Sequence, residues 1–141
     1  NATHLIKKIC QAVCKKNQII KVFGNDYPTC DGTGVRDYIH VEDLSTAHIE
    51  ALNHLSKEKD NLTLNCGYSN GYSVLQVISA MEKVIGKKLT TQIHKRRSGD
   101  GAQLVANSRK IKNILNWTPK FNNLETILSH ALAWEKTLYK Q

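Results

Sequence analysis

The stretch from Ser73 to Gly86 most restricts the fold, because it contains both the start and the stop signal of a helix. Ser73 and Gln76 have the spacing of a capping box, and Gly86 follows the last apolar position. Apolar residues recur between them at helical spacing: Val74, Val77, Ile78, Met81, Val84 and Ile85. Such a stripe has to be buried against other elements, so the chain is expected to form a layered fold around this helix.

Shorter helix and strand patterns alternate around it. Helices are predicted at 4–16, 43–56, 108–115 and 124–139, and strands at 19–23, 36–41, 62–67 and 90–95. Thr3 is the expected N-cap of the first helix. Residues 24–34 are rich in turn formers. The sequence therefore predicts one mixed α/β domain over residues 1–141, with a small sheet and flanking helices.

The C-terminal helix is expected to be buried along one side. Its apolar residues at helical spacing are Ile127, Leu128, Ala131, Leu132 and Leu138. Trp117 and Trp134 are expected to pack the two C-terminal helices together rather than to stack on a ligand.

The bulk properties narrow the class of protein. The net charge of +8 favours a polyanionic partner, but the basic residues are scattered and no nucleic-acid-binding signature accompanies them. We therefore expect no nucleic acid partner. No apolar run approaches the roughly 18 residues of a membrane span, and no signal pattern begins the chain, so a cytoplasmic protein is expected. Met81 is the only methionine, so the sequence is expected to be part of a longer one.

Four cysteines give no metal-site pattern. Cys10 and Cys14 share a predicted helix face, but a second pair of soft ligands with suitable spacing is missing from the sequence. We expect reduced thiols and no metal.

Two dinucleotide-enzyme motifs are incomplete in this sequence. Gly32-Thr33-Gly34 and Gly99-Asp100-Gly101 supply the first two glycines of a phosphate-binding fingerprint, but Asp37 and Leu104 stand at the third position. Both glycine pairs are interpreted as turns. A Tyr with a Lys four residues later, the pair that short-chain dehydrogenase chemistry needs, is also missing.

Arg36 and His40 are candidate functional residues that also have structural interpretations. Arg36 lies between a glycine turn and a strand, where a guanidinium can form paired bonds to phosphate oxygens or an ion pair with a neighbouring carboxylate. His40 has the chemistry of a general base, but a hydrogen bond to the start of the next helix is the alternative. Glu42 and Asp43 are interpreted as first-turn acids that the helix dipole favours.

The sharpest basic cluster is Lys95-Arg96-Arg97, followed by Ser98, Gly99 and Asp100. It follows a predicted strand and so lies in a loop, where binding residues concentrate. A basic edge that protects a strand from aggregation is the alternative.

A longer pattern resembles a known family. Residues 23–29 (Phe-Gly-Asn-Asp-Tyr-Pro-Thr) and 31–41 (Asp-Gly-Thr-Gly-Val-Arg-Asp-Tyr-Ile-His-Val) closely resemble UDP-glucose 4-epimerases of the extended short-chain dehydrogenase superfamily. Similar matches follow at 3–6, 64–67, 96–100 and 116–119. The resemblance implies the C-terminal, UDP-sugar-binding lobe of such an enzyme. The Rossmann half, which binds NAD and carries the Tyr/Lys pair, is not in this chain.

The resemblance also implies a role for individual residues. The implied substrate-binding set comprises His4 and Leu5 beside the nucleotide, the backbone around Lys21 and Phe23 at the uracil, Arg36 and Arg97 on the diphosphate, Asp100 on a ribose hydroxyl, and Leu104 beside the sugar. No catalytic, NAD-binding or metal-binding residue is implied here. Residues 42–67 are expected to pack as a helix and an edge strand of the missing Rossmann domain.

The implied reaction of the whole enzyme is inversion at C4 of the sugar through a 4-keto intermediate with bound NAD. The chain alone is expected to be inactive, and a homodimer is expected only of the full-length enzyme. Leu104 stands where the family tunes room for N-acetylated sugars, and Gly101 replaces a usual proline. A UDP-GlcNAc or UDP-glucuronate epimerase therefore stays open, as does a non-catalytic module that binds UDP-sugars or polyanions.

Overall fold

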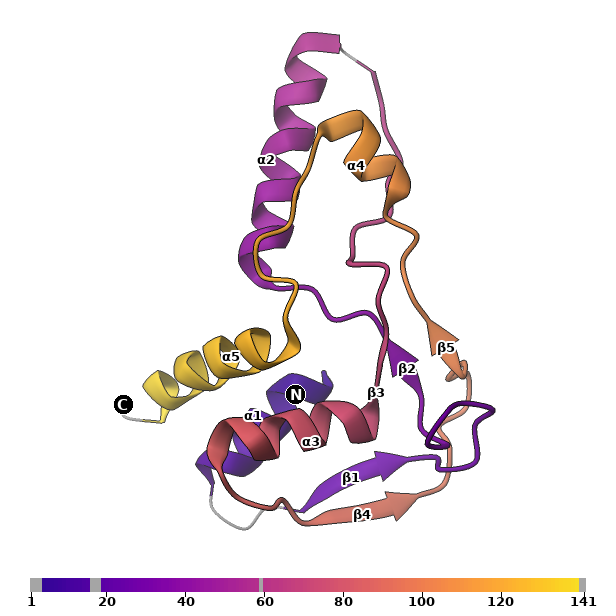
Figure 1. Ribbon diagram of the computed structural model, residues 1–141, viewed down its shortest axis with the longest axis vertical. Coiled ribbons are helices and arrows are strands. Elements are labelled where there is room, and N and C mark those ends of the chain that lie inside the picture. Colours follow the sequence, from indigo (N-terminus) through magenta and orange to yellow (C-terminus); the bar gives the residue numbers. More distant parts are fainter. Residues whose placement is uncertain (1–3, 16–18, 59, 140–141) are drawn as a thin grey trace.

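The computed structural model describes residues 4–15, 19–58 and 60–139. Its elements, in chain order, are α1 (Leu5–Cys14), β1 (Ile20–Phe23), β2 (Val35–Arg36), α2 (Val41–Glu58), β3 (Tyr72–Ser73), α3 (Val74–Ile85), β4 (Thr91–His94), β5 (Gln103–Leu104), α4 (Arg109–Leu115) and α5 (Leu124–Leu138). The molecule is elongated: α2 and α4 form one end, and α1, α3, β1 and β4 form the other (Figure 1). The mixed α/β class with a small sheet content and flanking helices is confirmed.

The described helices agree with the predicted ones to within a few residues, but two strand predictions need correction. The strand expected at 36–41 is only two residues long, because residues 37–40 pair with no described strand and α2 begins at Val41. Residues 62–67 form no strand ladder with any described residue, although 62, 64 and 66 are half-buried and 61, 63 and 65 are exposed. Thr3 lies outside the described residues, and His4 is the N-cap of α1 without a side-chain bond.

Two small sheets, rather than one, hold the strands. In the first, β1 and β4 run parallel, with Ile20 opposite Thr91 and Phe23 opposite His94. In the second, β2 lies between β3, which is antiparallel to it, and β5, which is parallel to it. The sequence did not predict β3 or β5, since two residues are too few for a detectable alternation.

The larger core lies where α1, β1, α3 and α5 meet. Helix α3 is central because its predicted stripe is buried, with Val77 and Met81 fully inaccessible. The capping box at Ser73 and Gln76 is confirmed, and Gly86 ends the helix at a φ of 64°. The buried members of this core are Ile9, Cys10, Ala12, Ile20, Val22, Val77, Ile78, Ala80, Met81, Leu124, Leu128 and Leu132.

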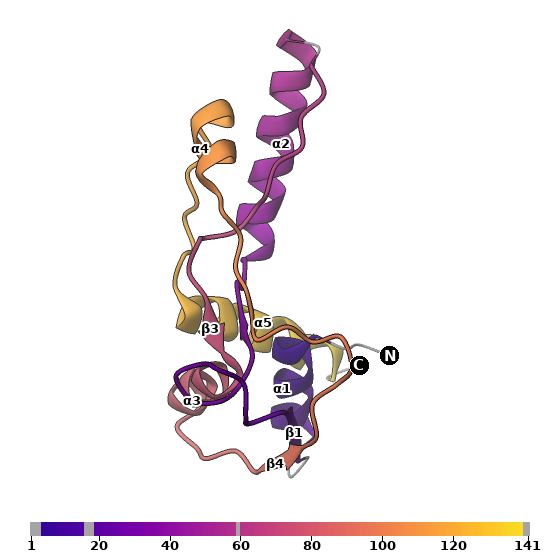
Figure 2. The same cartoon turned by 90° about the vertical axis from the view of Figure 1, so that its right-hand side faces the viewer.

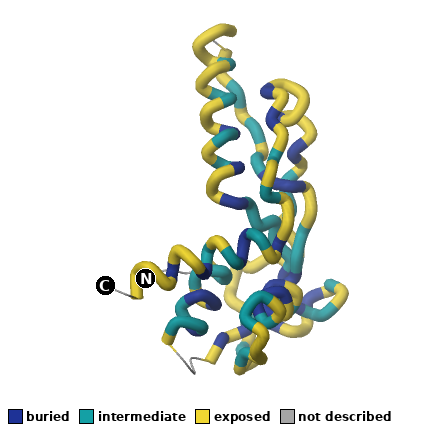
Figure 3. The backbone as a smooth tube through the Cα atoms, turned by 60° about the vertical axis from the view of Figure 1, so that its left-hand side comes forward, coloured by how far each residue is buried: buried dark blue, intermediate teal, exposed yellow. Residues whose placement is uncertain are grey.

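The smaller core lies between α2 and α4. Its buried members are Ala47, Ile111, Leu115 and Trp117. Trp117 is buried as expected, but it packs between α4 and α2 rather than between the two C-terminal helices. Trp134 is 66% exposed and Leu138 is 43% exposed, so their predicted burial was wrong. Figure 3 shows that much of α2, on the side away from this core, is exposed. Among the described residues, no helix combines the length and the apolar character needed to cross a membrane.

Asp43 lies at the junction of the two cores. It is only 1% exposed, and its carboxylate accepts hydrogen bonds from the Tyr68 hydroxyl at 2.6 Å and from the backbone N–H groups of Lys120 and Phe121 at 2.8 and 2.9 Å. Burial raises its pKa, but these bonds outweigh burial and hold the pKa of Asp43 below its usual value. Asp43 is in the first turn of α2 as predicted, but its main partners are distant in sequence.

Replacing Ser73 with alanine tests how much the cap of α3 contributes. Ser73 Oγ accepts from the Gln76 N–H at 3.1 Å and also donates to the Asp31 carboxylate, so both the cap and a loop anchor are lost. We expect the free energy of unfolding to fall by about 1–2 kcal/mol in urea denaturation. Ser45→Ala is the control, because this exposed hydroxyl bonds only to the Val41 carbonyl within its own helix. Equal losses in the two variants would contradict the capping role.

Candidate functional site

One edge of β1 has no strand partner among the described residues. The N–H groups of Ile20 and Gly24 donate to the carbonyl oxygens of Thr90 and His94, at 2.9 and 2.8 Å. Successive residues of a strand direct their backbone groups to opposite edges, so the N–H and C=O groups of Lys21 and Phe23 face away from β4. This edge therefore offers neighbouring donors and acceptors to a planar partner.

An aromatic and cationic cluster lies where β1 and β4 end. The rings of Phe23 and His94 are 5.5 Å apart, and the Arg97 guanidinium lies 3.9 Å from the centre of the Phe23 ring. A cation at this distance from a ring face is attracted by its quadrupole. Arg97 is otherwise exposed, so its hydrogen-bond donors stay available beside the open edge of β1.

Arg36 and Asp100 meet at the second sheet. Arg36 donates to the carbonyl oxygens of Val35 and Gly101, and its guanidinium lies 3.7 Å from the Asp100 carboxylate. Its ion-pair partner is thus Asp100 rather than the adjacent Asp37, whose carboxylate accepts backbone N–H groups of Tyr68 and Ser69. Leu104 is the strand partner of Arg36 and is 71% exposed.

The remaining substrate-binding candidates lie at the ends of elements. His4 is exposed at the start of α1, and Leu5 packs against the larger core. Lys21 is exposed on β1. The structure thus brings Phe23 together with Arg97, and Arg36 together with Asp100 and Leu104.

Tyr38 is a residue of this region that the sequence did not single out. It is two residues beyond Arg36, and burial raises the pKa of its phenol to about 12, against the lowering effect of the Arg36 charge. A neutral hydroxyl beside a cation is a hydrogen-bond donor for anionic ligands. The sequence could have indicated Tyr38 as a site candidate, because alternate residues of an extended chain share a face and Tyr38 is two residues after Arg36.

His40 is a structural residue, as the alternative interpretation held. Its Nδ1 accepts the Glu42 N–H at 3.1 Å, and its Nε2 is 3.0 Å from Nδ1 of His130. Its ring also stacks on Phe121 at 4.4 Å. Both ring nitrogens are therefore engaged within the protein, which leaves no general base free for a substrate.

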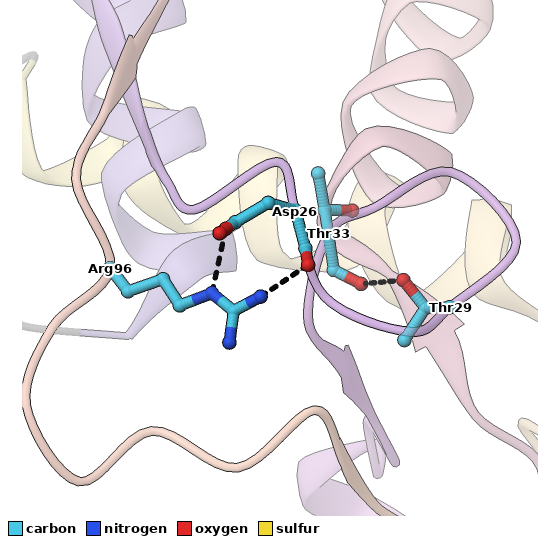
Figure 4. Close-up of polar contacts among 4 residues, drawn as sticks. All are labelled: Asp26, Thr29, Thr33 and Arg96. Atoms are coloured by element: carbon cyan, nitrogen blue, oxygen red, sulfur yellow. Dashed lines mark hydrogen bonds and ion pairs between the residues drawn. The ribbon is translucent and has the colours of Figure 1, made fainter.

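Arg96 is directed differently from its neighbour Arg97. Its Nε donates to Asp26 Oδ1 at 2.6 Å, and a second nitrogen donates to the Asp26 carbonyl (Figure 4). Its guanidinium also lies 4.1 Å from the centre of the Tyr27 ring. Gly24 permits this packing, because a Cβ there would lie 2.5 Å from the Tyr27 ring. The basic run 95–97 alone did not distinguish the two arginines, whereas the family resemblance named only Arg97.

The glycine pairs do not form a dinucleotide site. Both are turns, as interpreted from the sequence: one leads into β2 and the other into β5, each a strand of two residues. A pyrophosphate-binding fingerprint needs a helix N-terminus directly after the turn. Neither glycine pair therefore fits the pyrophosphate of NAD.

The cysteines are free thiols. Burial raises the pKa of Cys10 to about 12, and the thiolate is the form that binds metals. The described residues contain no cluster of three or more metal-ligating side chains.

The region thus offers two guanidinium groups and an adjacent backbone edge. Arg36 lies on β2 and Arg97 in the loop after β4, and an open cavity of about 570 Å³, lined in part by Arg96, lies at the ends of β1 and β4. Two guanidinium groups on separate elements suit an anion with several spread oxygens better than a single phosphate.

Sequence comparisons find a family model and UDP-glucose 4-epimerases that match most of this chain. Residues 1–129 match the family described as GDP-mannose 4,6 dehydratase. A UDP-glucose 4-epimerase of Azospirillum brasilense is 46% identical over 97% of this chain, and one of Homo sapiens is 41% identical over 94%. The chain covers 39% and 38% of these two proteins, so it spans about two-fifths of the length of its curated relatives.

Solved structures agree with the sequence relatives. A UDP-glucose 4-epimerase of Stenotrophomonas maltophila, solved with bound NAD and formylated UDP-arabinopyranose, superposes with a TM-score of 0.93 at 36% identity. That match covers 99% of this chain and 41% of the other. A UDP-Glc/GlcNAc 4-epimerase of Campylobacter jejuni gives a TM-score of 0.83 at 42% identity, over 97% of this chain and 41% of that one.

Proposed function

Because this chain belongs to the family described as GDP-mannose 4,6 dehydratase and its relatives are UDP-glucose 4-epimerases, we propose that it is the nucleotide-sugar-binding portion of a UDP-sugar 4-epimerase. The observation that carries the proposal is the combination of Arg97, which stacks on Phe23 at the end of β1, with the pair of Arg36 and Asp100, the latter three residues further along the same loop. A nucleoside diphosphate has the matching chemistry, with a base at one end and spread phosphate oxygens at the other.

The base binds at the backbone of Lys21 and Phe23 in this proposal. Uracil presents an N–H between two carbonyl groups, and the unpaired edge of β1 offers an acceptor and donors to complement them. The backbone of Lys21 and Phe23 is already ordered by the pairing of β1 with β4, so binding of the base costs little conformational entropy. His4 and Leu5 at the start of α1 flank the nucleotide.

The phosphates and the ribose bind beyond the base. Arg97 and Arg36 hold the diphosphate through charge-assisted bonds, and Asp100 accepts from a ribose hydroxyl. Since Asp100 lies 3.7 Å from Arg36, the carboxylate also keeps this guanidinium in place before the nucleotide arrives. Leu104, on the neighbouring strand position to Arg36, faces the sugar.

The contribution of this chain to epimerisation is positioning. In the complete enzyme, NAD bound by the part outside this chain would supply the hydride chemistry at C4 of the sugar. The residues present here hold the UDP anchor fixed while the sugar presents either face, and no described residue is a candidate for the proton transfer. We infer that the chain alone neither binds NAD nor epimerises a UDP-sugar.

Residues 42–67 form the surface for the rest of the enzyme in this proposal. Ile49, Leu52 and Leu55 of α2 are 56%, 63% and 46% exposed, which is unusual for one face of a single helix. The alternating burial of residues 61–66 is typical of a strand, and in this proposal they pair with the edge of the Rossmann sheet. A Rossmann domain would cover both.

The second candidate function is a UDP-sugar 4-epimerase that prefers an N-acetylated sugar. Leu104 is exposed beside Arg36, so the sugar side of the site is not closed by this residue. The structural neighbour from Campylobacter jejuni acts on both UDP-Glc and UDP-GlcNAc, as its description states. Activity on N-acetylated substrates is therefore the variant of the proposal to test first.

Titration calorimetry with UDP, UDP-glucose and a random oligonucleotide tests the proposal. We expect UDP and UDP-glucose to bind with similar affinity, because the anchor groups contact the nucleotide, and NAD to give no heat. Oligonucleotide binding that falls steeply with salt, without a response to UDP, would identify a polyanion-binding module instead.

A further inference from the structure

Resting on the proposed function, we propose that Arg96 is a positioning residue: clamped to Asp26 and Tyr27, it fixes the 95–101 loop so that Arg97 and Asp100 are held in place for the nucleotide. The clamp consists of Arg96, Asp26 and Tyr27. The family resemblance implies a role for Arg97 alone, and the contacts of Arg96 give it a different task.

The two arginines lie on opposite sides of an extended segment. Arg97 stacks on Phe23 at the end of β1, whereas Arg96 stacks on Tyr27 in the 24–34 loop. Adjacent side chains of an extended chain point in opposite directions, so engaging one fixes the direction of the other. The Arg96 contacts therefore determine where Arg97 is presented.

The 24–34 loop is a rigid support for the clamp. Thr33 is fully buried, and its N–H and hydroxyl both donate to Asp31, at 2.9 and 2.7 Å. Asp31 in turn accepts from the hydroxyl of Ser73 at the start of α3, and Thr29 donates to the Thr33 carbonyl at 2.7 Å (Figure 4). The loop is thus anchored to the central helix of the larger core.

The 95–101 loop, in contrast, has few ties of its own. Asp100 N–H donates to the Arg97 carbonyl at a long 3.4 Å, and Gly101 is tied to Arg36 through its carbonyl. Cβ atoms built on Gly99 and Gly101 would meet nothing within 4 Å, so neighbouring atoms do not confine these residues. Without the clamp, this loop has to be ordered when the nucleotide binds.

Three single substitutions separate a clamp from a simple charge effect. Arg96→Met keeps much of the stem but removes the charge and the bonds to Asp26. In the unchanged protein, the hydrogen bond from Arg96 holds the pKa of Asp26 below its usual value. Asp26→Asn weakens this bond and leaves every positive charge in place. Lys95→Met is the matched control, since it removes the same charge one residue away.

UDP affinity measured by calorimetry is the readout. A clamp predicts that Arg96→Met and Asp26→Asn both weaken UDP binding by about tenfold, since the loop must then be ordered on binding, whereas Lys95→Met changes it by no more than about twofold. A pure charge effect predicts the opposite for Asp26→Asn, which makes the site more positive and would leave the affinity unchanged or improved.

Amide hydrogen exchange without ligand gives a second readout. The clamp predicts faster exchange across residues 97–101 in Arg96→Met and Asp26→Asn, with α3 unchanged. Unaltered UDP affinity in Asp26→Asn overturns the clamp while leaving the proposed function intact. A lack of UDP binding by the unchanged chain overturns the proposed function, and the positioning role falls with it.

Discussion

Replacing Asp43 with asparagine is expected to lower the free energy of unfolding by about 3 kcal/mol. The carboxylate accepts from the Tyr68 hydroxyl and from the Lys120 and Phe121 N–H groups, and an amide places an NH₂ group against at least one of these donors. Urea denaturation followed by circular dichroism measures the loss. Glu42→Gln is the control, because Glu42 is the adjacent acid in the same first turn and is exposed.

The pH dependence of the same variant gives an independent check. The folded pKa of Asp43 is depressed, so its stabilisation is present above the unfolded value near 4 and is lost as the pH falls through the folded pKa. The stability difference between the unchanged chain and Asp43→Asn should therefore be constant from pH 7 to about 5 and shrink at lower pH. A difference that persists undiminished into strong acid would contradict the role of the ionised carboxylate.

Replacing Arg36 with glutamine is expected to weaken UDP binding by about 10- to 100-fold. The variant loses charge-assisted bonds to the diphosphate, each of which contributes about 1.5–3 kcal/mol. Loss of one such bond corresponds to the expected weakening of about 10- to 100-fold. Arg36→Lys keeps the charge without the planar fork and should fall in between. Calorimetry with UDP at fixed salt provides the measurement.

Lys21→Gln is the matched control for Arg36. It removes one positive charge from the neighbouring sheet but leaves the Lys21 backbone, which is the part proposed to contact the base. Its UDP affinity should change by no more than about threefold. Because Arg36 also bonds to Gly101, thermal unfolding must show that the variant is folded. Unchanged affinity in a folded Arg36→Gln protein would remove Arg36 from the site.

The features that could be predicted from the sequence are those fixed by contacts between residues close to one another in the chain. Helix α3 was predicted with its cap and its end, because Ser73, Gln76 and Gly86 act within a few residues of the stripe they flank. The structural role of His40 was also foreseeable, since its bond to Glu42 spans two residues. These contacts need no knowledge of the remainder of the fold.

Features that depend on distant partners were missed. The position of Asp43 in its helix was correct, but its bonds to Lys120 and Phe121 span 77 and 78 residues. The different directions of Arg96 and Arg97 follow from Asp26 and Phe23, which are on another segment. Trp134 was wrongly predicted to be buried. It is close to the apolar side of α5, but the sequence does not indicate how far the neighbouring helices cover that side.

The candidate site residues could be named from the sequence, but their arrangement could not. Arg36, Arg97 and Asp100 were chosen through the family resemblance, and their grouping around two sheets became visible only in the fold. The open edge of β1 follows from the two-stranded sheet, which a sequence pattern does not reveal.

The two separate cores have a consequence for cooperativity. The α2–α4 end has few buried side chains, and Figure 2 shows it extending away from the end formed by α1, α3, β1 and β4. Such an end can open locally while the larger core stays closed, because the two share few contacts. Asp43 ties the start of α2 to the segment before α5, and the His40–His130 contact ties the same region to α5 itself. A nucleotide bound beside β1, as proposed, would therefore stabilise the far end of the molecule only as far as these contacts couple the two cores.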